Sequence, residues 1–79
     1  MIWIIVCKDK VGSLPRRMAV IEDHRKYLST NPIKTLVSGP LTDFDGETMN
    51  GSFFMVEADE ISEIHTFQEN DPLYHADVW

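Results

Sequence analysis

The chain has 79 residues, of which 43% are hydrophobic, and its seven Lys and Arg stand against thirteen Asp and Glu, a formal net charge of -6. This length fits a single domain, residues 1–79, with a core small enough that a second subunit would help to stabilise it. The acidic balance offers no phosphate-neutralising surface, which excludes nucleic acid and anionic membranes as expected partners and favours a small molecule or another protein.

The first residues predict a strand in a protein of the reducing cytoplasm. Ile2 to Cys7 is an unbroken apolar run, typical of a strand covered on both faces, so we expect it at the centre of the sheet. The run is too short for a secretory leader, and no basic residue precedes it. Cys7 is the only cysteine, so we expect no disulfide and interpret Cys7 as a packed core residue.

A helix is predicted from Ser13 to Thr30, ended by Asn31-Pro32. Its apolar stripe consists of Leu14, Met18, Ile21 and Leu28. His24 lies three residues after Ile21 and four before Leu28, so its imidazole faces inward with the stripe. An inward imidazole needs a hydrogen-bond acceptor that fixes its tautomer.

Two further strands follow. Ile33 to Val37 is one candidate, ended by Gly39-Pro40, and Ser52 to Ala58 is the other. Because Asp45-Gly46 and Asn50-Gly51 are turn dipeptides, residues 41 to 50 are expected to form a long hairpin loop.

A second helix and a partial strand complete the chain. Asp59 is a suitable N-cap for this helix, and Asn70-Asp71-Pro72 closes it. The segment from Ala76 to Trp79 would begin a further strand.

The order β-α-β-β-α, with a possible partial β, predicts an α+β ferredoxin-like sandwich. Right-handed crossovers place both helices on one face of an antiparallel sheet. The other face also needs a cover, since the first strand is apolar on both sides, and the same face of a second copy is the simplest one. We therefore expect a homodimer.

No cofactor or metal site is predicted. Asp43-x-Asp45-Gly46 resembles the start of a calcium loop, but the required later glycine and glutamate are not in place. The side chains of Cys7, His24, His65 and His75 lack the short pair spacings of zinc sites. No glycine-rich phosphate loop is present.

Topology suggests where polar groups gather. The first and second strands run the same way, and the edge where they end also holds the start of the first helix and the end of the second. We expect Asp71, Ser38-Gly39 and Arg17 near this edge, with Asp71 as the acceptor for His24. A helix that begins at Leu14 would place His24 about 15 Å down from the edge, too deep for that contact, so the pairing requires a later helix start.

Four strings of the sequence carry a family resemblance: SLPRRMAVIEDHRKYL, VSGPLTDFDG, GSFFMVEADE and ENDPLYHADVW. Along essentially its whole length the chain resembles the YCII-related domain proteins of the dimeric α/β-barrel superfamily. Members commonly have a proline two residues before the histidine, where this chain has Glu22. Such a proline implies that the helix starts there, which would put His24 in a first turn close to Asp71.

The resemblance implies a function. In that family the histidine and the aspartate of Asp-Pro form a proposed catalytic centre, which corresponds to His24 and Asp71. Relatives include a dehydrochlorinase and, more distantly, muconolactone isomerase, so the implied chemistry is proton transfer with elimination or isomerisation of a small organic acid or phenol. Arg17 and the Ser38-Gly39 backbone would bind the anionic or phenolic part of the substrate. Family members usually continue into a fourth strand beside the first, so we expect the final strand of this chain to be incomplete.

Two alternatives stay open. In the first, the chain is a non-catalytic ligand-binding or accessory module in which His24 and Asp71 form a buried structural pair. In the second, it is a haem or antibiotic-type monooxygenase of the same superfamily, although no residue here resembles the active-site pattern of that group.

Overall fold

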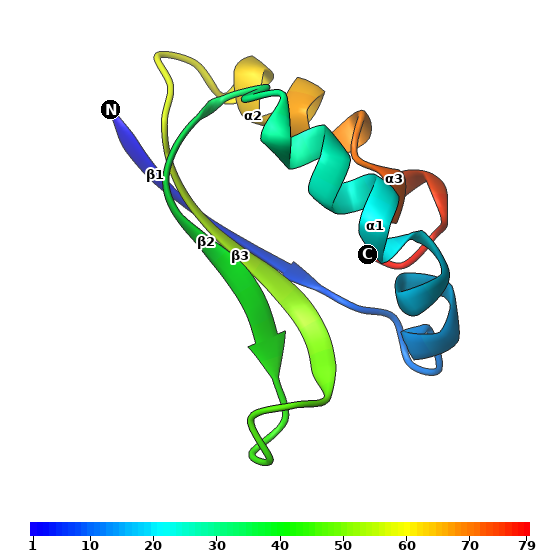
Figure 1. The fold of residues 1–79 in the computed structure, drawn as a ribbon. Helices are drawn as coiled ribbons and strands as arrows, with labels where there is room; N and C mark the ends of the chain where they lie inside the picture. The colour runs from blue at the N-terminus through cyan, green and yellow to red at the C-terminus, as the bar shows by residue number, and fades with distance from the viewer.

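A three-stranded antiparallel sheet carries all the helices on one face (Figure 1). The computed structural model describes residues 1–79. The elements in chain order are β1 (Ile2–Lys8), α1 (Leu14–Ser29), β2 (Lys34–Thr42), β3 (Met49–Glu57), α2 (Ile61–Glu69) and α3 (Pro72–His75). The α+β, ferredoxin-like fold class predicted from the sequence is confirmed.

The strands are arranged in the order β1-β3-β2. β3 pairs antiparallel with both neighbours, with Ile5 opposite Phe54 on one side and Gly39 opposite Phe53 on the other. The expectation that Ile2 to Cys7 forms the central strand is therefore wrong for this sheet. An apolar run reports which faces of a strand are covered, whereas a central position depends on how many neighbours its backbone pairs with.

The core lies between the sheet and the helices. Strand alternation turns Ile5 and Cys7 toward the helices, and the same holds for Phe54 and Val56 on β3. They pack with Ala58, Ile64 and Phe67 into one cluster. The polar side chains described below lie beside this core cluster.

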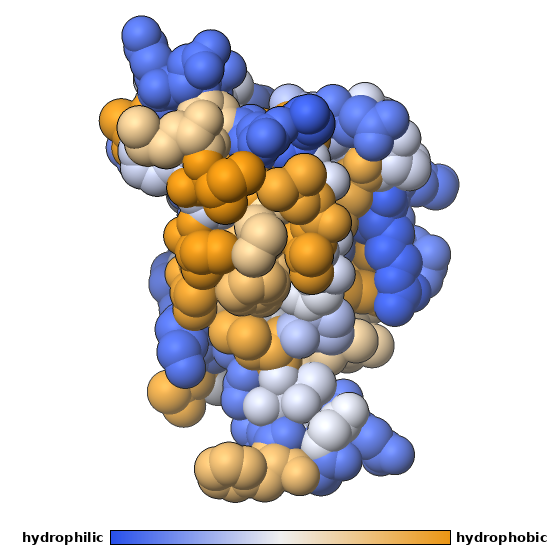
Figure 2. Space-filling model, turned by 90° about the vertical axis from the view of Figure 1, so that its left-hand side faces the viewer, coloured by the Kyte–Doolittle hydropathy of each residue, from blue (hydrophilic) through white to orange (hydrophobic).

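The opposite face of the sheet is apolar and open. Its large side chains are about half exposed, and we call this set the open face: Ile2, Ile4, Val6, Leu36 and Val37. Figure 2 shows hydrophobic residues gathered on this side of the molecule. The open face therefore has the apolar composition of a buried surface, but no other part of the chain covers it.

The β2–β3 hairpin is longer than the sequence indicated. Gly39 and Pro40 lie inside β2 instead of ending it, which is tolerated because β2 is an edge strand and a missing N–H there costs no ladder bond. The loop shortens to residues 43–48. Asp45 organises it, since its carboxylate accepts bonds from the Glu47 and Thr48 amides, and Gly46 adopts a φ of +72°.

Gly51 lies within β3 and not in a turn, contrary to the expectation for Asn50-Gly51. A Cβ at this position would approach the Cys7 carbonyl oxygen to 2.6 Å and the Leu41 side chain to 3.0 Å. Gly51 is thus required by the close approach of neighbouring strands.

Helix α1 is one continuous helix, so the later start that Glu22 suggested is wrong. Its buried side chains are Arg17, Ile21 and His24, with Leu28 partly buried. Leu14 and Met18, which the sequence placed in the apolar stripe, are exposed. The buried side of the helix is thus partly polar, and this polar part forms the site.

Helix α2 begins one residue later than expected: its N-cap is Glu60, which forms a capping box with Glu63. The chain after α2 contains no strand. Instead of the strand expected from Ala76 to Trp79, α3 ends in a turn in which the Val78 amide donates to the Leu73 carbonyl at 3.0 Å. No helix of the fold combines the length and apolar character needed to cross a membrane.

Candidate functional site

A buried histidine and a buried aspartate meet between α1 and α3. His24 Nδ1 lies 2.9 Å and 2.8 Å from the two carboxylate oxygens of Asp71. His24 is 7% exposed and Asp71 is fully buried. The structure therefore brings together the two residues that the sequence paired, while their catalytic role stays a prediction.

The contact forms although α1 is continuous and His24 lies deep along it. Helix α2 has only nine residues and rises about 14 Å, so it ends well short of the sheet edge. Asp71 follows directly, and α3 then lies against α1. We expected Asp71 at the sheet edge, whereas the short α2 holds it at the level of His24.

The pairing fixes the orientation of the imidazole. Because a carboxylate only accepts, Nδ1–H must be the donor, and the neutral ring then carries its lone pair on Nε2. Nε2 makes no hydrogen bond inside the chain. The buried side-chain atoms that lack any partner are Ser13 Oγ and Trp79 Nε1, so Nε2 is not sealed in the core, and the His24 side chain lines a pocket.

Asp71 is itself held in place. It is the N-cap of α3, where Oδ1 accepts the Leu73 amide at 2.8 Å and Pro72 occupies the first helical position. On another side of His24, Trp79 makes an edge contact with ring centroids 6.3 Å apart. Rotation of the imidazole is therefore restricted by a hydrogen bond and by aromatic packing.

Arg17, predicted to bind substrate, is 1% exposed and already paired. Its Nε and Nη2 donate to the two oxygens of Asp9 at 2.6 Å and 2.9 Å, and Nη2 also donates to Ser52 Oγ at 2.8 Å. Nη1 makes none of these bonds. The bidentate pair neutralises most of the Arg17 charge and fixes the guanidinium plane, leaving one nitrogen for a ligand.

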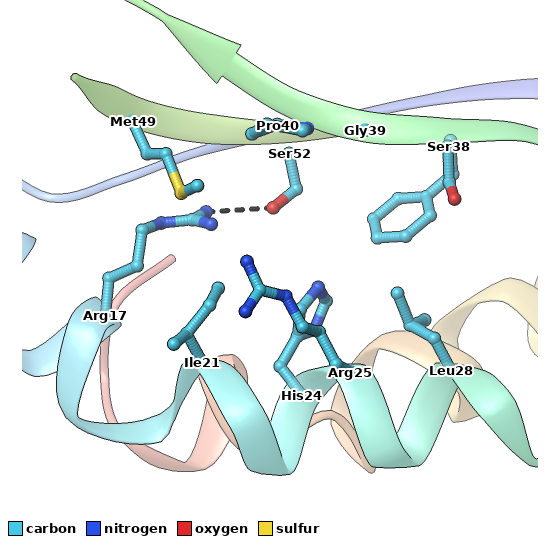
Figure 3. Close-up of a pocket in the computed structure, with 11 residues that line it drawn as sticks. Arg17, Ile21, His24, Arg25, Leu28, Ser38, Gly39, Pro40, Met49 and Ser52 are labelled. Carbon is cyan, nitrogen blue, oxygen red and sulfur yellow. Dashed lines mark hydrogen bonds between the residues drawn. The ribbon is translucent and has the colours of Figure 1, made fainter. Parts of the chain in front are cut away.

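A pocket of about 150 Å³ separates α1 from strands β2 and β3 (Figure 3). A cavity of this size holds one benzene ring. In Figure 3 the side chains of Arg17, His24 and Arg25 all extend from α1 toward the sheet. The pocket is lined by Arg17, Ile21, His24, Arg25, Leu28, Ser38, Gly39, Pro40, Met49, Ser52 and Phe54.

The pocket lining contains only basic ionisable side chains although the chain is acidic. It contains two arginines and a histidine but no carboxylate. Ser38 and Gly39, which the sequence placed at a strand end, lie in the middle of β2 and still form part of the wall. Together these residues provide a slot for one ring, with cationic side chains and the His24 imidazole in its wall.

Sequence reasoning missed Asp9, Ser52 and Arg25. Ser52 carried a usable signal, because it shares the helix-facing side of β3 with Phe54 and a polar residue in that register needs a partner. Asp9 and Arg25 carried no such signal, because nothing in their spacing in the sequence distinguishes a residue at a functional site from one exposed to solvent.

Two other titratable groups border this region. Burial raises the pKa of the Cys7 thiol, although its Sγ accepts a bond from Gln68, so Cys7 is protonated and a poor nucleophile at neutral pH. Burial, and then the charge of Asp71, raise the pKa of Tyr27, whose hydroxyl donates to the Phe67 carbonyl at 2.7 Å.

No three His, Cys, Asp or Glu side chains converge as a metal site would require.

Comparisons with known proteins place this geometry in context. The family model described as "YCII-related domain" matches residues 1–79. No curated protein matches the chain. Among solved structures, the chain is similar to a 5-chloro-2-hydroxyhydroquinone dehydrochlorinase from Burkholderia phenoliruptrix in complex with 2,5-dihydroxybenzoquinone. The two share 38% identity and a TM-score of 0.87 over 99% of this chain and 84% of the other.

Proposed function

The chain belongs to the YCII-related domain family, and from that premise we propose that it is a small enzyme that transfers a proton on a phenolic or hydroxyquinone-type substrate, with elimination or isomerisation. One observation carries the proposal. His24 Nδ1 is held by both oxygens of a fully buried Asp71, which leaves Nε2 free in a cationic pocket.

In the proposed mechanism Nε2 removes a hydroxyl proton from the ring of the substrate. The electron pair left on oxygen enters the ring, and the negative charge is stabilised by the guanidinium groups of Arg17 and Arg25. Asp71 keeps the imidazole in the required tautomer and stabilises the imidazolium that forms. In an isomerisation His24 then returns the proton to a ring carbon. In an elimination it returns the proton to the carbon that bears chlorine, and loss of a second hydroxyl proton to solvent expels chloride from that carbon.

The size and charge of the pocket support one substituted ring as substrate. The similar solved enzyme is named for dehydrochlorination of a chlorinated hydroxyhydroquinone and was captured with a hydroxylated quinone. Loss of HCl from such a ring gives a hydroxyquinone, a proton and chloride, so no external oxidant is needed. A pocket of about 150 Å³ is large enough for a ligand of this single-ring class.

The proposed enzyme is a cytoplasmic homodimer. The open face is an unbroken apolar surface of a kind that monomers rarely expose, and a second copy covers it with the same residues. Cys7 has no disulfide partner and fits a reducing compartment.

The test uses 5-chloro-2-hydroxyhydroquinone, with chloride release as the readout. Wild type is expected to release chloride faster than buffer. His24→Asn keeps a side-chain N–H near the position of Nδ1, so it can still bond Asp71, but it removes Nε2. We expect it to lose about 10²–10⁴-fold in turnover with its melting temperature little changed. Equal rates for the two proteins would reject His24 as the base.

A structural role of the same pair is the rival, and one observation favours it: Asp71 also caps α3, so its burial has a purpose without catalysis. The rival predicts no turnover by wild type. It also predicts that His24→Leu lowers stability, because this change removes the Nδ1–H donor and leaves the buried Asp71 carboxylate without it. Any loss of ligand binding would then match the loss of folded protein.

A further inference from the structure

The two arginines of the pocket are not equivalent. Arg17 is buried and held by the bidentate Asp9 pair, whereas the Arg25 side chain is 56% exposed and its partner is a single glutamate one turn away. Arg25 Nη1 donates to Glu22 Oε1 at 2.5 Å. One guanidinium is thus fixed in place and the other is free to change partners.

The Glu22–Arg25 pair is weakly held. Glu22 is 74% exposed and is not part of the pocket lining, while Arg25 is. Solvated ion pairs at i, i+3 spacing on a helix add little to stability, so a ligand loses little by displacing Glu22. Figure 3 shows the Arg25 side chain beside His24, directed toward the sheet.

The charge balance of the pocket depends on Arg25. The positive charge of Arg17 is compensated by Asp9, and no carboxylate lines the cavity. A ligand oxyanion in the pocket would therefore meet one uncompensated cation once Glu22 is displaced. A neutral ring would gain nothing from that exchange and would leave the Glu22 pair intact.

From this asymmetry we propose that Arg25 is the specificity residue of the site: it releases Glu22 to bind a ring oxyanion and so selects ionised single-ring substrates over neutral ones. This rests on the proposed function for the identity of the pocket, and it adds the charge state of the substrate: one hydroxyl is already ionised, and His24 removes the proton of another. Arg17 supplies a fixed donor for either form, whereas Arg25 distinguishes between them.

The experiment compares two single-ring ligands by calorimetry at pH 7 and low salt. The first is 2,5-dihydroxybenzoquinone, whose hydroxyls are vinylogous carboxylic acids and are ionised. The second is hydroquinone, which is neutral. Wild type should prefer the quinone, and added salt should narrow the preference because Arg25 is half exposed.

Arg25→Met keeps the aliphatic length and removes the charge. It should weaken binding of the anionic quinone by about tenfold or more and change hydroquinone affinity by less than about twofold. Glu22→Gln, which frees Arg25, should strengthen quinone binding several-fold. Lys26→Met is the matched control: it removes one positive charge from the same helix outside the lining and should change neither affinity.

The outcomes separate this inference from the proposed function. Unchanged quinone preference in Arg25→Met, an equal loss in Lys26→Met, or no binding of either ligand by wild type would overturn the role of Arg25. His24→Asn should keep the preference for the quinone over hydroquinone but should not turn over the chlorinated ring. If His24→Asn still turned over the chlorinated ring, His24 would be rejected as the base, and the role of Arg25 in selectivity would be unaffected.

Discussion

The two faces of this sheet have similar apolar side chains and opposite surroundings. On the helix-covered face, Ile5 and Phe54 belong to a packed core, and a polar neighbour such as Arg17 has hydrogen-bond partners within the chain. On the open face, Ile4 and Val6 are half exposed, with no partner in the chain. The candidate site thus depends on enclosure by the helices, whereas the open face is the surface on which we propose that a second copy packs.

The largest expected effect comes from breaking the buried ion pair on the covered face. Arg17→Met leaves the Asp9 carboxylate almost buried without its partner, and we expect a loss of about 3–5 kcal/mol in the free energy of unfolding. Urea denaturation measures it. Arg16→Met is the control, because Arg16 is an exposed neighbour that bonds only the Ala76 and Asp77 carbonyls, and it should cost less than about 1 kcal/mol. Similar costs for both variants would show that burial of this pair does not matter.

The next effect concerns the open face. Ile4→Glu puts a charge at the centre of the proposed dimer surface and should weaken self-association by at least about a hundredfold while the helix-covered core stays folded. Sedimentation equilibrium measures the dissociation constant. Val11→Glu introduces the same charge at a fully exposed turn residue and should leave the dimer intact. A monomeric wild type at high micromolar concentration contradicts the homodimer.

A smaller effect probes packing between neighbouring strands. Gly51→Ala forces a Cβ against the Cys7 carbonyl oxygen and should cost about 1–3 kcal/mol. Gly39→Ala meets no atom within 4 Å and should change stability by less than about 0.5 kcal/mol. Thermal unfolding of both variants is the measurement, and equal melting temperatures would mean that the strands separate easily at Gly51.

The smallest effect lies on the exposed rim, in acid. The hydrogen bond and charge of Lys10 hold the pKa of Asp77 below its usual value of 3.8. A lowered folded-state pKa gives stability that is present above 3.8 and is lost as the pH falls through the folded value. Asp77→Asn should therefore unfold with a slightly shallower acid dependence than wild type in denaturant titrations between about pH 5 and pH 2. Because Asp77 is fully exposed, a large difference would be unexpected.

The sequence predicted the elements and their order well, because strand runs such as Ile2 to Cys7 and the helical spacing around His24 are local patterns. It also paired His24 with Asp71, through topology and family resemblance. The predicted inward orientation of His24 agrees with its burial.

The failures share one cause, which is that they depend on contacts distant in sequence. Pro40 could remain in a strand only because β2 has a free edge, and Gly51 reflects a close approach by Cys7. The level of Asp71 relative to His24 depends on the length of α2. The partners of Arg17 come from a turn and from another strand, so no pattern within α1 reveals them.

The most direct test of the central claim needs no turnover. Nitrogen chemical shifts of ¹⁵N-labelled histidine report which ring nitrogen of neutral His24 carries the proton, with His24→Asn used for assignment. We expect a proton on Nδ1, an unprotonated Nε2, and a shift of the Nε2 signal when 2,5-dihydroxybenzoquinone is added. A proton on Nε2, or an Nε2 signal that ignores the bound ligand, would contradict it.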